Sequence, residues 1–135
     1  MGLFVGNESV KQVYVGSTPV KAVYVGSGKI WPTIEVHEVT LTDVAGGGTV
    51  HPLLTVTVPA GETWSVRIQG TVTKAPTIST WRPRFRIGST DSETYAQGAA
   101  VDFSGTVTAA NSTIAMVTNA SSINSSFVGT VTIEK

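Results

Sequence analysis

The chain has 135 residues, nine of them basic and nine acidic, and it contains no cysteine. A neutral chain exerts no long-range attraction on nucleic acid or on an anionic membrane, so neither partner is expected. Without cysteine there are no disulfides and no thiolate metal sites, so packing, hydrogen bonding and assembly must stabilise the fold. Abundant Thr, Ser, Val, Ala and Gly favour strands and tight turns, which predicts an all-β protein.

The first ten residues, MGLFVGNESV, contain no basic segment followed by an apolar run of signal-peptide length. No stretch of the chain approaches the roughly 20 apolar residues of a membrane span. We therefore expect the chain to be made in the cytoplasm and to fold there.

A ten-residue unit occurs three times in residues 1–32, most evidently in the stretch VYVGSTPVKAVYVGSGKIWP. Each unit contains an aromatic residue, a valine and a glycine, then small polar residues and a branched apolar residue. Gly6, Gly16 and Gly26 each follow an apolar run, as glycine does where a strand enters a turn with positive φ. Three decamers of short strands and turns are therefore predicted for this segment.

Both faces of these short strands are predicted to be apolar. Side chains alternate between the faces of a strand, so Tyr14 lies on one face while Val13 and Val15 lie on the other. About thirty residues in short strands cannot bury both faces in a core of their own. We therefore expect residues 1–32 to be an attachment and oligomerisation segment, with a meander packed on the rest of the chain as the alternative. The expected interface residues are Val13, Tyr14, Val15, Val23, Tyr24, Val25, Ile30 and Trp31.

Residues 33–135 have the pattern of an antiparallel β-sandwich. Residues 34–44 alternate as a strand does, and residues 51–72 predict a strand, a turn at 59–62 and a second strand. With the strands predicted further along, the total is about seven to nine, which favours a jelly roll, with an immunoglobulin-like order as the alternative. Alternation predicts that the core includes Trp64, Val66, Ile68, Phe85 and Ile87.

Arg82, Arg84 and Arg86 alternate with the predicted core residues Phe85 and Ile87. Alternate positions on a strand lie about 7 Å apart on one face, so the three guanidinium groups are expected to form a cationic row. This row is a candidate docking face for an acidic protein surface. The alternative is a solvated outer face whose arginines pair with nearby carboxylates.

The sequence offers no constellation of residues that defines a reaction. His37 and His51 lack the spacing to other ligands that zinc requires, and residues 90–93, TDSE, predict a solvated loop rather than a calcium loop. No carboxylate pair has assignable acid and base roles. We therefore predict no catalytic residue, no metal and no cofactor. A glycan-cleaving enzyme, the alternative, would depend on a pair among Glu35, Glu38, Asp91 and Glu93.

Residues 13–32 also resemble an N-terminal signature of virion structural proteins of tailed bacteriophages, especially minor tail and accessory head proteins of phages that infect actinobacteria. The matching residues are Tyr24, Val25, Gly26, Ser27, Ile30, Trp31 and Pro32, with Tyr14, Val15, Gly16, Ser17 and Val20 as an earlier copy. The resemblance covers about the first 32 residues. The rest of the chain is similar only to a generic viral sandwich.

The resemblance implies a non-enzymatic part of the phage particle, often trimeric. A short chain with one sandwich favours a capsid decoration protein, a homotrimer bound to the major capsid protein or to another virion protein on the particle surface. The alternative is a minor tail or baseplate protein that binds a host-surface glycan. Trp31, Trp64 and Trp81 are candidates for a platform on which sugars stack.

Overall fold

The computed structural model describes residues 4–5, 8–9, 12–25, 28–31, 33–119 and 122–135. Apart from one short 3-10 turn, η1 (Ser79–Trp81), every regular element in this part of the chain is a β-strand. All strand pairs are antiparallel. The prediction of an all-β protein with an antiparallel sandwich is therefore confirmed.

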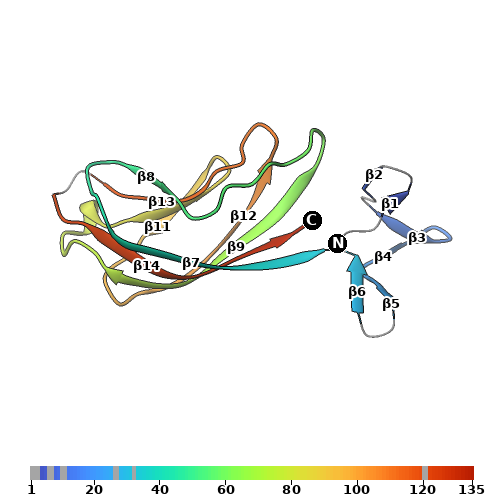
Figure 1. Cartoon of the computed structure of the whole chain (residues 1–135), viewed down its shortest axis with the longest axis horizontal. Helices are drawn as coiled ribbons and strands as arrows, with labels where there is room; N and C mark the ends of the chain where they lie inside the picture. The colour runs from blue at the N-terminus through green and yellow to red at the C-terminus, as the bar shows by residue number, and fades with distance from the viewer. Residues whose placement is uncertain (1–3, 6–7, 10–11, 26–27, 32, 120–121) are drawn as a thin grey trace.

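The repeat folds into three two-stranded hairpins, one for each ten-residue unit. Their strands are β1 (Phe4–Val5) with β2 (Glu8–Ser9), β3 (Val13–Val15) with β4 (Thr18–Val20), and β5 (Val23–Val25) with β6 (Gly28–Trp31). Gly16 has a φ of 62° in the β3–β4 turn, as its place after an apolar run predicts. Figure 1 shows the hairpins beside the end of the sandwich where β7 begins.

The sandwich consists of two four-stranded sheets. The first has the order β12-β9-β14-β7, with strands β12 (Ala100–Thr108), β9 (Thr63–Lys74), β14 (Ser125–Glu134) and β7 (Ile34–Val44). The second has the order β11-β10-β13-β8, with strands β11 (Thr90–Thr94), β10 (Arg84–Ile87), β13 (Ile114–Val117) and β8 (Val50–Pro52). The sheets lie as two layers along the length of the sandwich (Figure 1).

The strand pairs are nested around the β10–β11 hairpin. β10 pairs with β11, β9 with β12, β8 with β13 and β7 with β14, each antiparallel. The chain thus pairs as one long hairpin that is folded over itself. Successive strands change sheets at every connection except the one between β10 and β11.

The core lies between the two sheets and follows the predicted alternation. Trp64, Val66 and Ile68 of β9 are buried, as are Phe85 and Ile87 of β10, so these core predictions are confirmed. Rings from both sheets meet at the centre. The ring centroid of Phe85 lies 4.8 Å from that of Phe127 and 5.6 Å from that of Tyr95, both edge-on, which is a favourable arrangement for aromatic pairs.

Two expectations about strands are wrong. Of residues 51–58, only 51 and 52 belong to a strand, β8, because its partner β13 begins at Ile114. The amide nitrogens of Leu53 and Leu54 still reach the Ile114 carbonyl oxygen, at 2.9 and 3.5 Å, and beyond them the chain has left the sheet. Residues 90–93, expected as a loop, belong to β11, because their backbone pairs with β10 across a two-residue turn.

Candidate assembly surfaces

Hairpin β3–β4 presents apolar side chains on both of its faces. Tyr14 is 59% exposed and Val15 is 73% exposed, while Val13 is partly buried. Tyr14 lies opposite Pro19, and Val15 lies opposite Thr18. Because neighbouring residues of a strand point to opposite faces, the side chains of Tyr14 and Val15 point in opposite directions. A single partner surface within the chain could therefore cover only one of them.

The strands of each hairpin pair only with each other in the part of the chain that the structure describes. An isolated two-stranded hairpin is at best marginally stable in water. Of the other predicted interface residues, Val23 is partly buried in β5. The side chains of Tyr24, Val25, Ile30 and Trp31 lie outside what the structure describes. The hairpins thus need contacts beyond their own strands.

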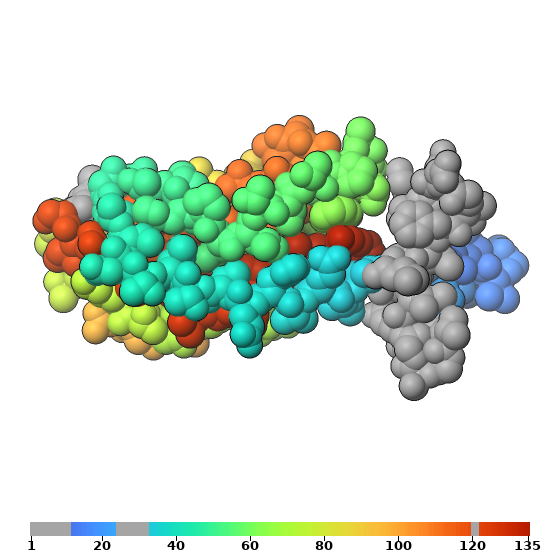
Figure 2. Space-filling view, viewed as in Figure 1, coloured from blue at the N-terminus to red at the C-terminus, as the bar shows by residue number. Residues whose placement is uncertain are grey.

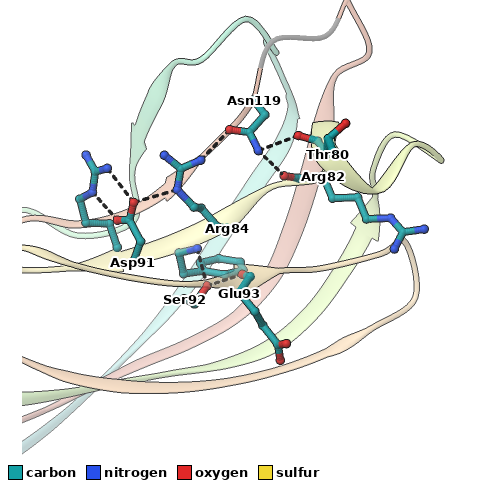
Figure 3. A network of polar contacts seen from close by, with 9 residues as sticks. Thr80, Arg82, Arg84, Asp91, Ser92, Glu93 and Asn119 are labelled. Atoms are coloured by element: carbon teal, nitrogen blue, oxygen red, sulfur yellow. Dashed lines mark hydrogen bonds and ion pairs between the residues drawn. The ribbon is translucent and has the colours of Figure 1, made fainter.

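The predicted arginine row divides into a pair and a separate residue (Figure 3). Arg84 and Arg86 of β10 share the carboxylate of Asp91. Arg84 Nε lies 2.8 Å from Asp91 Oδ2, while Arg86 Nε lies 2.5 Å from Oδ1 and Nη2 lies 2.9 Å from Oδ2. Arg82 precedes the strand and donates from Nη2 to the Thr77 carbonyl oxygen at 3.0 Å. The Arg84–Asp91–Arg86 group carries one net positive charge.

Asp91 stays ionised well into the acid range. The hydrogen bonds from Arg86 lower its pKa most, the one from Arg84 adds to the effect, and together they bring the pKa to about 2 despite some desolvation. The contact with Asp91 also raises the pKa of Arg86. For Arg84 and Arg86, this geometry corresponds to the alternative in which the arginines pair with a nearby carboxylate. Docking of an acidic partner on the remaining charge stays a prediction.

Arg84 also forms a hydrogen bond with Asn119, which connects two loops at one end of the sandwich (Figure 3). Its Nη1 donates to Asn119 Oδ1 at 2.5 Å. The Asn119 amide nitrogen in turn donates to the carbonyl oxygens of Thr80 and Arg82, at 3.1 and 3.2 Å. Asn119 therefore joins the end of β13 to the η1 turn. No sequence signal pointed to this role, because the two segments meet only in the folded chain.

A hollow of about 510 Å³ opens on the outer face of the β12–β9–β14 sheet. It exists because small hydroxyl side chains from three adjacent strands stand side by side. The side chains that line it include Ser65, Ser104, Thr106, Thr132, Arg67 and Glu134. In the sheet register, Ser65 lies between Thr106 and Glu134, and Arg67 lies between Ser104 and Thr132. The sequence did not reveal this site, because its strands are far apart along the chain.

The arginine that lines the hollow, Arg67, is already paired with a carboxylate. Arg67 makes two parallel bonds with Asp102, Nε to Oδ1 at 2.8 Å and Nη2 to Oδ2 at 2.7 Å. This contact raises the pKa of Arg67 and lowers the pKa of Asp102. Such a planar, two-pronged pair fixes the guanidinium group along the sheet surface.

Exposed apolar residues lie next to the hollow on the same face. Ile34 and Val36 of β7 are 46% and 64% exposed. Across the register, Ile34 lies opposite Glu134 and Val36 lies opposite Thr132, and both of these partners line the hollow. β7 is an edge strand of its sheet, and its first residues, in cyan, form part of the outer surface in Figure 2. The hollow thus has an apolar border.

The carboxylates that a glycan-cleaving enzyme would use lie on different sheets. Glu35 and Glu38 are on β7, whereas Asp91 and Glu93 are on β11. Glu35 lies 2.7 Å from Lys135 Nζ and 3.3 Å from His37 Nε2, and these hydrogen bonds lower its pKa, the one from Lys135 most. The structure therefore brings neither β7 carboxylate together with a β11 carboxylate.

The two described candidate tryptophans do not form a joint platform. Trp64, near the start of β9, is buried, and Lys135 Nζ lies 4.6 Å from the centroid of its ring. Trp81, beyond the other end of β9, is 40% exposed. A strand of twelve residues is roughly 40 Å long, so the two rings are far apart. The side chain of Trp31 lies outside the described residues.

Comparison with protein-family models, with curated proteins and with solved structures gave no match for this chain. Among the residues that the structure describes, no cluster of three or more His, Asp or Glu side chains could hold a metal ion. No helix in the described part of the chain is long and apolar enough to span a membrane.

Proposed function

We propose that this protein is a structural component of a tailed bacteriophage particle. It is a decoration protein that binds the assembled capsid as a homotrimer, with the repeat as its attachment segment and the sandwich exposed to solvent. The observation that carries the proposal is the exposure of Tyr14 and Val15 on opposite faces of hairpin β3–β4. An apolar hairpin of this kind needs partners on both sides. The resemblance of the repeat to phage virion proteins supplies the class of partner.

The strand order supports a jelly-roll topology for the sandwich. In an immunoglobulin-like order, the first two strands are neighbours in one sheet. Here β7 and β8 lie in different sheets, and all eight strands pair in nested fashion around the β10–β11 hairpin. This nesting agrees with the double Greek key of a jelly roll, an architecture that recurs in viral capsid proteins. The similarity is one of fold, so the exposed surfaces carry the functional assignment.

The mechanism that we propose is stabilisation by mass action. A protein that binds the assembled lattice and not the free subunits shifts the equilibrium towards the lattice, by an amount that grows with its concentration over its dissociation constant. A trimer presents three attachment segments at once. Once one segment has bound, the others bind at a high effective concentration, so modest individual contacts suffice for stable attachment.

Light scattering coupled to size exclusion tests the oligomeric part of the proposal on the full chain. We expect a trimer for the wild type. Tyr14→Asp places a charge on an apolar face of the hairpin and should give a monomer whose far-ultraviolet circular dichroism is unchanged. Thr40→Asp, at an exposed position of β7, is the matched control and should remain trimeric. A monomeric wild type would refute the proposal.

A further inference from the structure

We propose that the hollow on the β12–β9–β14 face receives the β3–β4 hairpin of a second copy of the chain. The contact would join two different surfaces, the hairpin of one copy and the hollow of the next, and would repeat head to tail around the trimer. This inference rests on the proposed homo-oligomer and names the surfaces that form it.

The hollow is large enough to accept an aromatic side chain. Its volume of about 510 Å³ falls within the range of roughly 300–1,000 Å³ that is typical of protein pockets. The hydroxyl side chains of Ser65 and Ser104 project little from the sheet, so the floor lies close to the backbone of β9 and β12. Tyr14 is the large aromatic side chain that β3–β4 exposes. Insertion of its ring would bury surface that its own chain leaves in water.

The chemistry of the two surfaces is also complementary. A buried tyrosine needs a hydrogen-bond partner for its hydroxyl group, and the carboxylate of Glu134, which lines the hollow, is such an acceptor. Residues 12–20 contain no charged side chain, so docking brings no new charge into the hollow. Arg67 is already paired with Asp102, so covering it leaves no unpaired cation.

Both surfaces lie at the same end of each molecule. Only residues 32 and 33 separate the last strand of the repeat from Ile34, which lies opposite Glu134 in the sheet. Ile34 and Val36 border the hollow and could contact Pro19, which lies opposite Tyr14 and on the same face of the incoming hairpin. Within one chain, however, the hairpin leaves both Tyr14 and Val15 exposed. A β3–β4 hairpin that enters the hollow therefore comes from another copy.

A contact between two different surfaces has a consequence for symmetry. Such heterologous contacts form closed rings when the rotation between copies closes, and a threefold rotation gives the proposed trimer. A saccharide is the other class of ligand that a hydroxyl-lined hollow could accept. The outward positions that the sheet register places around the hollow are held by Ile34, Val36, Thr132, Arg67 and Ser104, none of them an aromatic on which a sugar could stack. The second copy is therefore the better occupant.

Filling the hollow tests the contact directly. Ser65→Trp places a large side chain in the hollow, and Thr106→Trp does the same from β12. Thr71→Trp is the matched control, because Thr71 is an exposed residue of β9 that does not line the hollow. We expect both filling variants to weaken association at least about tenfold in analytical ultracentrifugation, and the control to remain trimeric. Melting temperatures near that of the wild type would show that the variants fold.

Mixing two defective chains distinguishes a heterologous contact from a symmetric one. Tyr14→Asp keeps its hollow, and Ser65→Trp keeps its hairpin, so an equimolar mixture should form a one-to-one heterodimer at a concentration at which each variant alone is monomeric. If instead the hairpins met each other symmetrically, Ser65→Trp alone would remain a trimer, which would overturn this inference and leave the proposed function standing. A monomeric wild type would overturn both. The third outcome concerns N-acetylglucosamine oligomers. If the wild type binds them, and Ser65→Trp remains a trimer but does not bind them, the hollow is a saccharide site and the inference is refuted.

Discussion

Gly70 of β9 lies directly opposite Gly129 of β14, and the ring of Phe127 lies against both glycines. A Cβ atom on Gly129 would lie 2.1 Å from the Gln69 carbonyl oxygen and 2.7 Å from Phe127 Cζ. One on Gly70 would lie 2.2 Å from the Val128 carbonyl oxygen. The absence of side chains therefore lets the two strands approach and lets a fully buried ring cover the gap, a known device for glycines in sheets.

Gly129→Ala should destabilise the sandwich by about 2–3 kcal/mol, because the new methyl group overlaps backbone atoms that cannot move independently of the sheet. The free energy of unfolding in urea measures the loss. Gly47→Ala is the control: φ at Gly47 is 89°, and an added Cβ meets nothing within 4 Å. This variant should lower the free energy of unfolding by about 1 kcal/mol, because it has the strain of a positive φ but no clash. Equal losses for the two variants would show that the close approach is unimportant.

The stability of the sandwich should fall in acid because of Asp91. Its pKa is about 2 in the folded chain, against an ordinary value of 3.8, so the unfolded chain takes up the proton first as the pH falls. The stabilisation is complete above the ordinary pKa and is lost as the pH falls towards 2. The free energy of unfolding, measured in urea from pH 6 to pH 2, should show this loss.

Asp91→Asn isolates that contribution, since the variant has no carboxylate to protonate. We expect a loss of about 1 kcal/mol at neutral pH, a value limited by solvent screening of the partly exposed pair. Below the folded pKa of Asp91, the curves of wild type and variant should converge. Asp102→Asn, which breaks the more exposed pair with Arg67, should cost less. Curves that stay parallel down to pH 2 would contradict this role of Asp91.

Thr118→Val should destabilise the end of the sandwich where β13 terminates. The buried Thr118 hydroxyl lies 3.0 Å from the Ala45 carbonyl oxygen, to which it donates, and it accepts from the Thr49 amide at 3.2 Å. Valine has the same shape but no hydroxyl, so these groups would lose a partner at a cost of about 1–3 kcal/mol. Urea unfolding measures the effect. Thr40→Val, at an exposed position of β7, should change stability by less than about 0.5 kcal/mol.

Local alternation was enough to predict which side chains enter the core. Trp64, Val66 and Ile68 are buried because a sheet with one covered face needs apolar residues at every second position. The strand order could not be predicted in the same way. Gly129 pairs with Val39 on one side and with Gly70 on the other, and these partners are distant in sequence. Only the three-dimensional packing selects such pairs.

The candidate surfaces were predictable to different degrees. The apolar repeat containing Tyr14 is visible in the sequence, because the same pattern occurs three times. Arg84 and Arg86 share the carboxylate of Asp91, which lies in β11. That Asp91 is their partner was not predicted, because the sequence predicted a loop at residues 90–93. The hollow depends on small residues such as Ser65 and Thr106 that have no distinctive pattern in the sequence. Their significance appears only when three strands lie side by side.

Co-sedimentation of the full chain with phage capsids that lack their decoration protein is the most direct test of capsid binding. We expect the wild-type protein to bind these capsids saturably, at a stoichiometry set by the capsid lattice, and Tyr14→Asp not to bind. If the wild-type protein does not sediment with the capsids but sediments with host cell walls, the decoration role is wrong and the protein belongs to the host-binding end of the tail.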